Sequence, residues 1–242
     1  MENNRNQLLR LLFIDIETVP QQKNYASLSP EWQQLWFEKN AKTMPENQSM
    51  EEVYNTRAGI LAEFGKIICI SIGYLYENEF QKLCLKIKNF SDNDEEALLK
   101  AFTTVVNMFC KRYNHFEFAG HNIREFDIPY ICRRMLINQL PLPSYLRLNN
   151  LKPWEVNAID TLHWWRFGDY KNYISLNLLA NVLGVLSSKD DISGADVRRV
   201  YYEENDLARI TTYCGKDVVT VANVLLRLKG LPIIDEENIS FA

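Results

Sequence analysis

The chain has 242 residues, of which 47% are hydrophobic and 24% are charged, and its formal net charge is −4. These values predict one large globular domain, or one domain with an insertion, that buries a sizeable core. The charge does not indicate a nucleic-acid-binding domain, which is more often basic, but it does not exclude one, because a cluster of catalytic carboxylates lowers the net charge.

The first predicted strand covers about residues 11–16 and leads into two acids. Four apolar residues precede Asp15, one residue separates it from Glu17, and Pro20 ends the strand. Side chains alternate along a strand, so Asp15 and Glu17 point to the same face. Two carboxylates about 4 Å apart repel each other by roughly 4 kcal/mol at an effective dielectric constant near 20, which favours a divalent metal between them. The alternative is a strand that runs out into a solvated acidic loop.

The segment of about residues 21–63 differs in composition from its surroundings and is predicted to be a helical insertion. It is rich in Gln, Asn, Glu and Lys. Ser29-Pro30-Glu31 has the pattern of a helix start, with an N-cap, a proline at the first helical position and an acid in the first turn. Trp32 and Trp36 share one helical face. We therefore expect the insertion to pack on the main domain through these rings or to form a flap over a site.

The rest of the chain is predicted to alternate between strands and helices. The predicted strands are a hairpin that pairs residues 66–74 with 79–88, followed by 116–120 and 158–160. Four helices are predicted. The first begins near Ser91, the second follows the strand 116–120 and ends at about residue 139, the third covers 175–183, and the last runs from about 205 to 229. An antiparallel meander followed by this alternation predicts an α/β fold, with a mixed five-stranded sheet and helices on both faces.

Two later stretches supply further chemistry-bearing residues. In residues 119–130 a strand ends at Gly120, a polar turn follows, and Asp127 lies where a helix begins. In the last long helix, Tyr213 and Asp217 are four residues apart and share one face. An aspartate among the valines and leucines of that helix needs a partner. Each residue alone could be a solvated acid or a core aromatic, and the case for a site depends on their combination.

These stretches resemble the three exonuclease motifs of the DEDD superfamily of 3′→5′ exonucleases, in the variety with tyrosine in the third motif (DEDDy). Residues 15–18 (Asp-Ile-Glu-Thr) match the first motif. Residues 122–130 match the second motif as it occurs in the proofreading domain of B-family DNA polymerases, including the Phe-Asp-x-Pro-Tyr ending, and residues 213–217 match the third. The resemblance spans roughly residues 9–229, and we expect a stand-alone form of this exonuclease.

The resemblance implies a ribonuclease-H-like fold and a two-metal mechanism. A site made of carboxylates suits Mg²⁺ or Mn²⁺ better than zinc. The implied metal ligands are Asp15, Glu17, Asp127 and Asp217. Tyr213 would orient the attacking water, and the product would be a nucleoside 5′-monophosphate released from the 3′ end of a single strand, with DNA preferred. The implied contacts to substrate are Thr18, Asn122 and Phe126.

Two alternatives stay open from the sequence. The chain could be a 3′→5′ exoribonuclease, because the sequence does not reveal which residues would lie near a 2′-hydroxyl. It could also be an inactive nuclease fold that serves as a nucleic-acid-binding or protein-binding module. The four acids argue against the second alternative, because a protein without this chemistry has no need to hold them together against their repulsion.

The remaining features concern location. The five cysteines are odd in number and form no C-x-x-C pair, which predicts reduced thiols in a cytoplasmic protein, with neither zinc nor disulfides. Arg10 and Asp15 interrupt the only apolar run near the N-terminus, so we expect no signal peptide. No stretch is long enough to span a membrane, and we expect no membrane partner.

Overall fold

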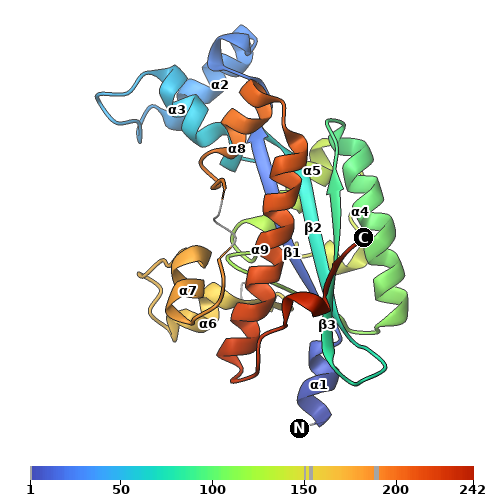
Figure 1. Ribbon diagram of the computed structural model, residues 1–242. Coiled ribbons are helices and arrows are strands. Elements are labelled where there is room, and N and C mark those ends of the chain that lie inside the picture. Colours follow the sequence, from blue (N-terminus) through green and yellow to red (C-terminus); the bar gives the residue numbers. More distant parts are fainter. Residues whose placement is uncertain (1, 150, 153–154, 188–190) are drawn as a thin grey trace.

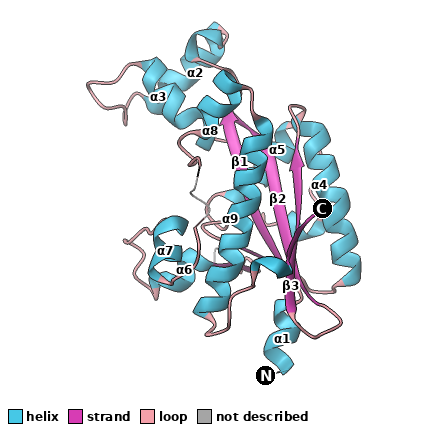
Figure 2. Ribbon diagram, viewed as in Figure 1, coloured by secondary structure: helices cyan, strands magenta, loops and turns pink. Residues whose placement is uncertain are grey.

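A computed structural model describes all residues except 1, 150, 153–154 and 188–190 (Figure 1). Its centre is a six-stranded mixed sheet in the order β5-β4-β1-β2-β3-β6, with helices on both faces (Figure 2). The strands are β1 (Leu11–Pro20), β2 (Gly65–Glu77), β3 (Leu83–Ser91), β4 (Glu117–Gly120), β5 (Ala158–Asp160) and β6 (Ile239–Phe241). The predicted α/β fold is confirmed, and the short edge strand β6 is added to the five strands expected from the sequence.

Most of the long helices lie where the sequence predicts them. The helices are α1 (Glu2–Leu8), α2 (Pro30–Asn40), α3 (Met50–Arg57), α4 (Glu95–Arg112), α5 (Asp127–Ile137), α6 (Thr161–Arg166), α7 (Leu176–Val182), α8 (Val197–Arg199) and α9 (Leu207–Leu228). Helices α1, α6 and α8 are short and were not predicted. None of the helices in the described ranges combines the length and the hydropathy needed to cross a lipid bilayer.

Strand β1 lies in the middle of the sheet, and its two edges are paired differently. On one side it runs antiparallel to β2 from Leu12 to Pro20. On the other side it runs parallel to β4, but only over Leu11–Phe13. β4 is short because the chain turns away after Gly120, and Asn122 adopts a left-handed backbone conformation with φ of 64°. The second half of β1 therefore has an edge that no strand covers, and α5 begins beside it.

The alternation of side chains along β1 divides the core into two layers. Leu12, Ile14 and Ile16 pack on one face with apolar residues of α4 and α5. Leu11 and Phe13 pack on the opposite face with apolar residues of α9. Helix α9 crosses that second face of the sheet along much of its length (Figure 1). The side chains at odd positions of β1 consequently face α9.

A glycine in β2 lets α9 lie close to the sheet. A Cβ atom on Gly73 would lie 2.8 Å from Cγ1 of Val218, so any larger residue would push α9 outward. Val218 directly follows Asp217 in α9. The close approach therefore brings the part of α9 that carries the third motif toward β1.

A buried ion pair fixes α5 relative to the sheet. Arg134 in α5 and Glu95 in α4 have side chains that are 3% and 7% exposed, and Arg134 Nη2 lies 2.6 Å from Glu95 Oε2. Glu95 also accepts a hydrogen bond from the backbone N–H of Ile67 in β2 (2.7 Å). A buried pair of this kind is costly to break because one charge would stay uncompensated. It therefore holds α5 in a fixed position, with Asp127 at its first residue.

Residues 21–63 contain α2 and α3, which pack around a small aromatic core of their own. Trp36 is fully buried, and its ring centroid lies 5.1 Å from that of Tyr54 and 4.9 Å from that of Phe64. Trp32 is 41% exposed, so of the two tryptophans only Trp36 is a core residue. The organisation of the chain as one domain with a helical insertion stays a prediction.

The β2–β3 hairpin differs from its predicted boundaries. β2 extends to Glu77, and β3 begins at Leu83 rather than at residue 79. The side chain of Asn78 accepts hydrogen bonds from the backbone N–H groups of Phe80 and Lys82. These bonds hold residues 78–82 in a loop, whereas the alternating pattern of the sequence favoured a strand there.

Candidate active site

Asp15 and Glu17 lie on the same face of β1, as their alternation predicts, and α9 covers that face. Both belong to the antiparallel ladder with β2, in which Asp15 is opposite Ser71 and Glu17 is opposite Cys69. The ladder shifts register directly after Glu17, at an irregularity between Glu17 and Thr18. Glu17 is buried and Asp15 is partly exposed. The two carboxylates therefore sit on a rigid central strand with little access to water.

Asp217 and Tyr213 reach the same place from α9. Both are only 8% exposed, and they lie one helical turn apart on the side of α9 that faces the sheet. Tyr213 packs with Val19 and Ile68 from β1 and β2, which fixes its ring beside the acids. Burial, reinforced by the charges of the nearby carboxylates, raises the pKa of Tyr213 well above its ordinary value. Its hydroxyl is therefore a neutral hydrogen-bonding group at physiological pH.

Asp127 enters from the uncovered edge of β1. Its Oδ1 accepts a hydrogen bond from the backbone N–H of Ile16 (3.1 Å), a donor that a longer β4 would have used. Asp127 is the first residue of α5 and is 3% exposed. Burial is the largest cause that raises its pKa, to about 7, and the charges of Asp160 and Asp217 act in the same direction.

The four carboxylates form one electrostatic unit. Burial, followed by the charges of the other three acids, raises the pKa of Asp15 well above its ordinary value. Burial and then the charge of Asp217 raise the pKa of Glu17 in the same way. One oxygen each of Asp15 and Glu17 and the sulfur of Cys214 lie within 4.8 Å of one another. Buried acids that repel each other in this way fit divalent cations, which would supply the missing positive charge.

Cys214 is a member of the site that the sequence did not identify. Its Sγ donates to Oδ2 of Asp15 (3.3 Å) and lies 3.4 Å from the main-chain oxygen of Asp15. Burial raises the pKa of its thiol well above the ordinary value, so the proton stays on sulfur. Its position three residues before Asp217 on the same helix was the available signal, because residues three apart are neighbours on a helix surface.

The turn of the second motif is held by groups on β5 and α6. The carboxylate of Asp160 accepts hydrogen bonds from the backbone N–H groups of Asn122 (2.9 Å) and Arg124 (3.1 Å). His121 is hydrogen-bonded to Thr161 (2.9 Å), and burial lowers its pKa. Asp160 and His121 thus position the turn that leads to Asp127. The sequence identified Asp160 only as part of a strand.

The three predicted substrate contacts lie next to the acids along the chain but have different surroundings. Thr18 follows Glu17 and lies near Tyr130, whose hydroxyl donates a hydrogen bond to the main-chain oxygen of Gly59 (2.8 Å). Asn122 has a buried side-chain oxygen, Oδ1, for which the described residues offer no hydrogen-bond donor. Phe126 is partly buried, with its ring centroid 5.4 Å from that of Tyr130. Of the three, Asn122 therefore has a buried acceptor that the described residues leave unpaired.

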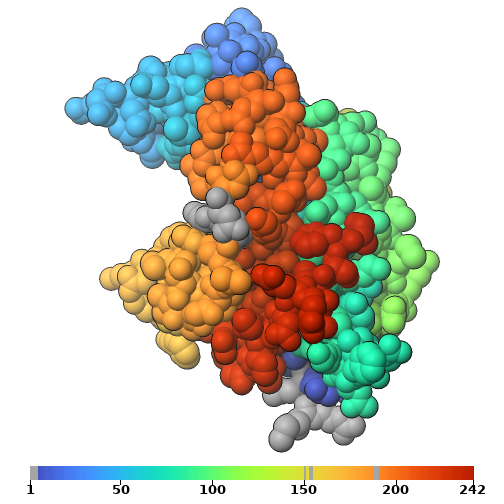
Figure 3. Space-filling view, in the orientation of Figure 1, coloured from blue at the N-terminus to red at the C-terminus, as the bar shows by residue number. Residues whose placement is uncertain are grey.

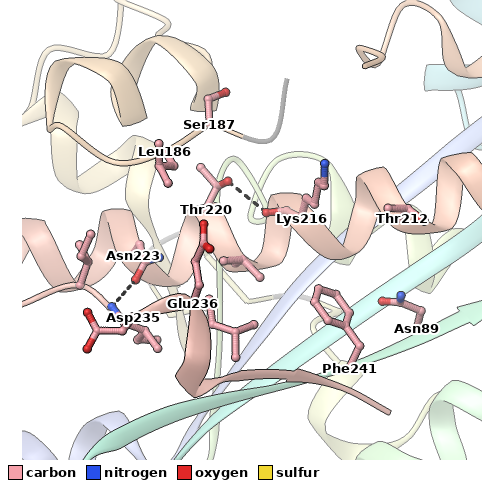
Figure 4. A pocket seen from close by; sticks show the side chains of 14 residues that line it. Asn89, Leu186, Ser187, Thr212, Lys216, Thr220, Asn223, Asp235, Glu236 and Phe241 are labelled. Carbon is pink, nitrogen blue, oxygen red and sulfur yellow. Dashed lines mark hydrogen bonds between the residues drawn. The ribbon is translucent and has the colours of Figure 1, made fainter. Parts of the chain in front are cut away.

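The surface near these elements is hollowed. Figure 3 shows a deep notch between the α2–α3 segment (blue) and the α6–α7 segment (gold and orange). A separate cavity of about 760 Å³ lies along another face of α9, where Thr212, Lys216 and Thr220 line it together with Phe241 of β6 (Figure 4). Tyr213 and Asp217 are not among the residues that line this cavity, so it is distinct from the carboxylate site.

Comparisons with known proteins show the family of the chain and its fold. Residues 60–233 match the model of a family described as a predicted 3′-5′ exonuclease related to the exonuclease domain of PolB. This range includes Asp127, Tyr213 and Asp217 but not β1. No curated protein matched the sequence.

Among solved structures, the family B DNA polymerase from the hyperthermophilic archaeon Pyrobaculum calidifontis is similar, with a TM-score of 0.52 and 14% sequence identity. The alignment covers 89% of this chain and 24% of the polymerase chain, so this chain spans about a quarter of that protein. At this identity the likeness concerns the fold, which is the expected ribonuclease-H-like fold.

Proposed function

Because this chain belongs to the family of predicted 3′-5′ exonucleases related to the exonuclease domain of PolB, we propose that it hydrolyses single-stranded nucleic acid from the 3′ end. In this proposal the enzyme is metal-dependent, prefers DNA and releases nucleoside 5′-monophosphates. The observation that carries the proposal is the largely buried cluster of four carboxylates from β1, α5 and α9, with Tyr213 beside it.

The roles follow from the surroundings of each side chain. Asp15, Glu17, Asp127 and Asp217 would hold two Mg²⁺ or Mn²⁺ ions. When bound, the ions would supply the positive charge that stabilises both the attacking and the leaving oxygen of the phosphodiester. The hydroxyl of Tyr213 would orient the attacking water, and Asn122 Oδ1 would accept a hydrogen bond from the terminal nucleotide. Thr18 and Phe126 would contact the same nucleotide.

The burial of the acids supports a mechanism in which bulk water is kept away from the site. Asp15 is the only one of the four acids that is more than 8% exposed, so approach to the phosphodiester is restricted. In such a site electrostatic interactions are stronger than in bulk water. The thiol of Cys214 would keep the carboxylate of Asp15 in one orientation through its hydrogen bond.

We propose that the substrate reaches the acids between the α2–α3 segment and the α6–α7 segment. The α2–α3 segment would be an insertion in a single exonuclease domain that controls access to the notch. We also propose a cytoplasmic location, which the five free cysteines support.

The direct test is digestion of 5′-labelled and 3′-labelled single-stranded DNA and RNA in Mn²⁺. A 5′-labelled ladder that shortens step by step, with immediate release of a labelled mononucleotide from the 3′-labelled strand, is expected for DNA. Faster digestion of RNA would support the exoribonuclease alternative. If neither polymer were digested and Mn²⁺ left the melting temperature unchanged, the inactive binding module would be the better description.

Tyr213→Phe should lower the single-turnover rate by about 10- to 100-fold, because the attacking water would lose the hydroxyl that orients it. The affinity for a short oligonucleotide should change much less, since the ring stays in its apolar contacts. Rapid-quench kinetics and fluorescence anisotropy measure the two quantities separately. Tyr76→Phe, which removes a hydroxyl from β2 at a distance from the acids along the strand, is the matched control. A variant that bound poorly but cleaved at the normal rate would contradict the assigned role.

A further inference from the structure

The loop between α6 and α7 carries three aromatic side chains that extend into solvent. Phe167, Tyr170 and Tyr173 are 90%, 72% and 65% exposed. We call residues 167–173 the aromatic loop. Among the described residues, none of the three rings has a ring-to-ring contact. Three exposed rings within seven residues leave a large apolar area in water, and patches of this kind mark interaction surfaces.

The backbone at Phe167 adds a second observation. Phe167 is the C-terminal cap of α6 and has φ of 45°, in the left-handed region. Glycine or asparagine usually occupies such a position, because a larger side chain is strained there. The next residue, Gly168, also has a positive φ of 90°. The ring of Phe167 is 90% exposed, so it does not pack on the fold in a way that would offset this conformation.

Both ends of the aromatic loop are attached to the turn that precedes Asp127. His121 Nε2 donates a hydrogen bond to the main-chain oxygen of Ile174 (2.9 Å), directly after the loop. Arg166, directly before the loop, forms an ion pair with Glu125 (3.3 Å). The α6–α7 segment also forms one wall of the notch seen in Figure 3. The loop is therefore fixed to the turn that leads to Asp127, in the segment that forms one wall of the notch.

Cations accompany the exposed rings. Lys171 lies within the aromatic loop and is exposed, and Asp169 of the same loop balances its charge. At the base of the loop, Lys229 Nζ lies 4.9 Å from the ring centroid of Trp164, which is itself 39% exposed. Proteins that bind single strands without sequence preference combine aromatic rings, on which bases stack, with cations that attract the phosphates. The composition of this surface matches that chemistry.

We propose that the aromatic loop is a stacking surface for the single strand upstream of the 3′-terminal nucleotide. The inference rests on the proposed function, because the carboxylate site defines where the 3′ end lies. Bases of the strand stack on Phe167, Tyr170 and Tyr173, and Lys171 lies near the phosphates. The loop thereby adds affinity that depends on the length of the strand and not on its sequence.

The test is the binding of fluorescein-labelled dT12 to the full chain that carries Asp15→Asn, which prevents digestion. Replacing all three rings of the aromatic loop by alanine should weaken binding at least about 30-fold, given the usual worth of stacking on several rings. The loss should be smaller for dT3, because we expect a strand of this length to fill the site at its end without reaching the loop. In the active protein, KM for dT12 should rise more than kcat falls.

Three control variants separate stacking from other effects. Tyr170→Phe with Tyr173→Phe keeps the rings and should retain affinity within about threefold, whereas leucine at all three positions keeps apolar area without rings and should bind as weakly as alanine. Phe80→Ala removes a ring that is 75% exposed in the β2–β3 hairpin and should leave binding unchanged. Circular dichroism checks that each variant is folded.

The outcomes are distinct. Binding of dT12 by the alanine variant within threefold of the parent overturns the inference, as does no binding of dT12 by the parent protein. Full binding of dT12 by the leucine variant also overturns it, because apolar area without rings would then be sufficient for binding. Binding that depends on the rings in a chain that digests neither DNA nor RNA would retain the stacking surface and reject the proposed hydrolysis.

Discussion

Asp15→Asn should lower the turnover of single-stranded DNA by at least about 1,000-fold, on the order of 4 kcal/mol in the activation barrier. Asp15 lies on the central strand and interacts electrostatically with all three of the other acids. Removing its charge therefore weakens the binding of cations at the point where the other ligands converge. Asp217→Asn should have a comparable effect from the α9 side. Turnover is measured by release of labelled mononucleotide in saturating Mn²⁺.

The same substitution should slightly raise the stability of the metal-free protein. One of four mutually repelling buried charges is lost, and asparagine nearly preserves the shape of the side chain. Asp235→Asn, at an exposed position outside the carboxylate cluster, is the control and should change neither turnover nor stability. Wild-type turnover by Asp15→Asn would show that the metal ligands are assigned wrongly. Low turnover with a strong fall in melting temperature would indicate a folding defect instead.

The positions of the acids could be predicted because local geometry determines them. The two-residue spacing of Asp15 and Glu17 fixes their common face on a strand, and the four-residue spacing of Tyr213 and Asp217 does so on a helix. Asp127 was predicted from the strand-to-helix turn that precedes it. The convergence of the three elements depended on the resemblance to a known fold, since no local rule brings α9 over β1.

The supporting residues could not be predicted, because their roles arise from tertiary contacts. Asp160 looks like the end of a short apolar strand, and only the parallel pairing of β5 with β4 brings its carboxylate to the backbone of Asn122. Cys214 looks like one of several buried thiols until α9 places it against Asp15. Strand β6 has only three residues, and its partner β3 is far away in the sequence, so no local pattern indicated the strand.

The metal-free protein should lose stability as the pH rises from about 4 to 7, and Mn²⁺ should reverse this dependence. The pKa of Asp127 is raised to about 7 in the folded state. Between its unfolded and folded values, the folded protein binds more protons than the unfolded chain, so the free energy of unfolding falls as the pH rises through this window. Asp15 and Glu17, whose pKa values are also raised, act in the same direction.

A shift of about three pKa units corresponds to about 4 kcal/mol, which is an upper bound for Asp127 alone. For a chain of this length, the melting temperature should fall by on the order of 5 °C or more between pH 5 and 8. Asp127→Asn should remove much of this fall. The difference between wild type and Asp127→Asn is the quantity to measure, because it cancels the contribution of His121, whose lowered pKa acts in the opposite direction.

Mn²⁺ changes the sign of this dependence because it binds the charged carboxylates and competes with protons for them. At a concentration 100 times its dissociation constant, an ion that binds only the folded state adds about 2.7 kcal/mol, and its affinity rises with pH over the same window. Melting curves in chelator and in Mn²⁺ should therefore diverge as the pH increases. Parallel curves would mean that the buried acids do not bind the metal. In that case their raised pKa values would reflect burial and mutual repulsion without a role in metal binding, and the carboxylate cluster would lose its catalytic interpretation.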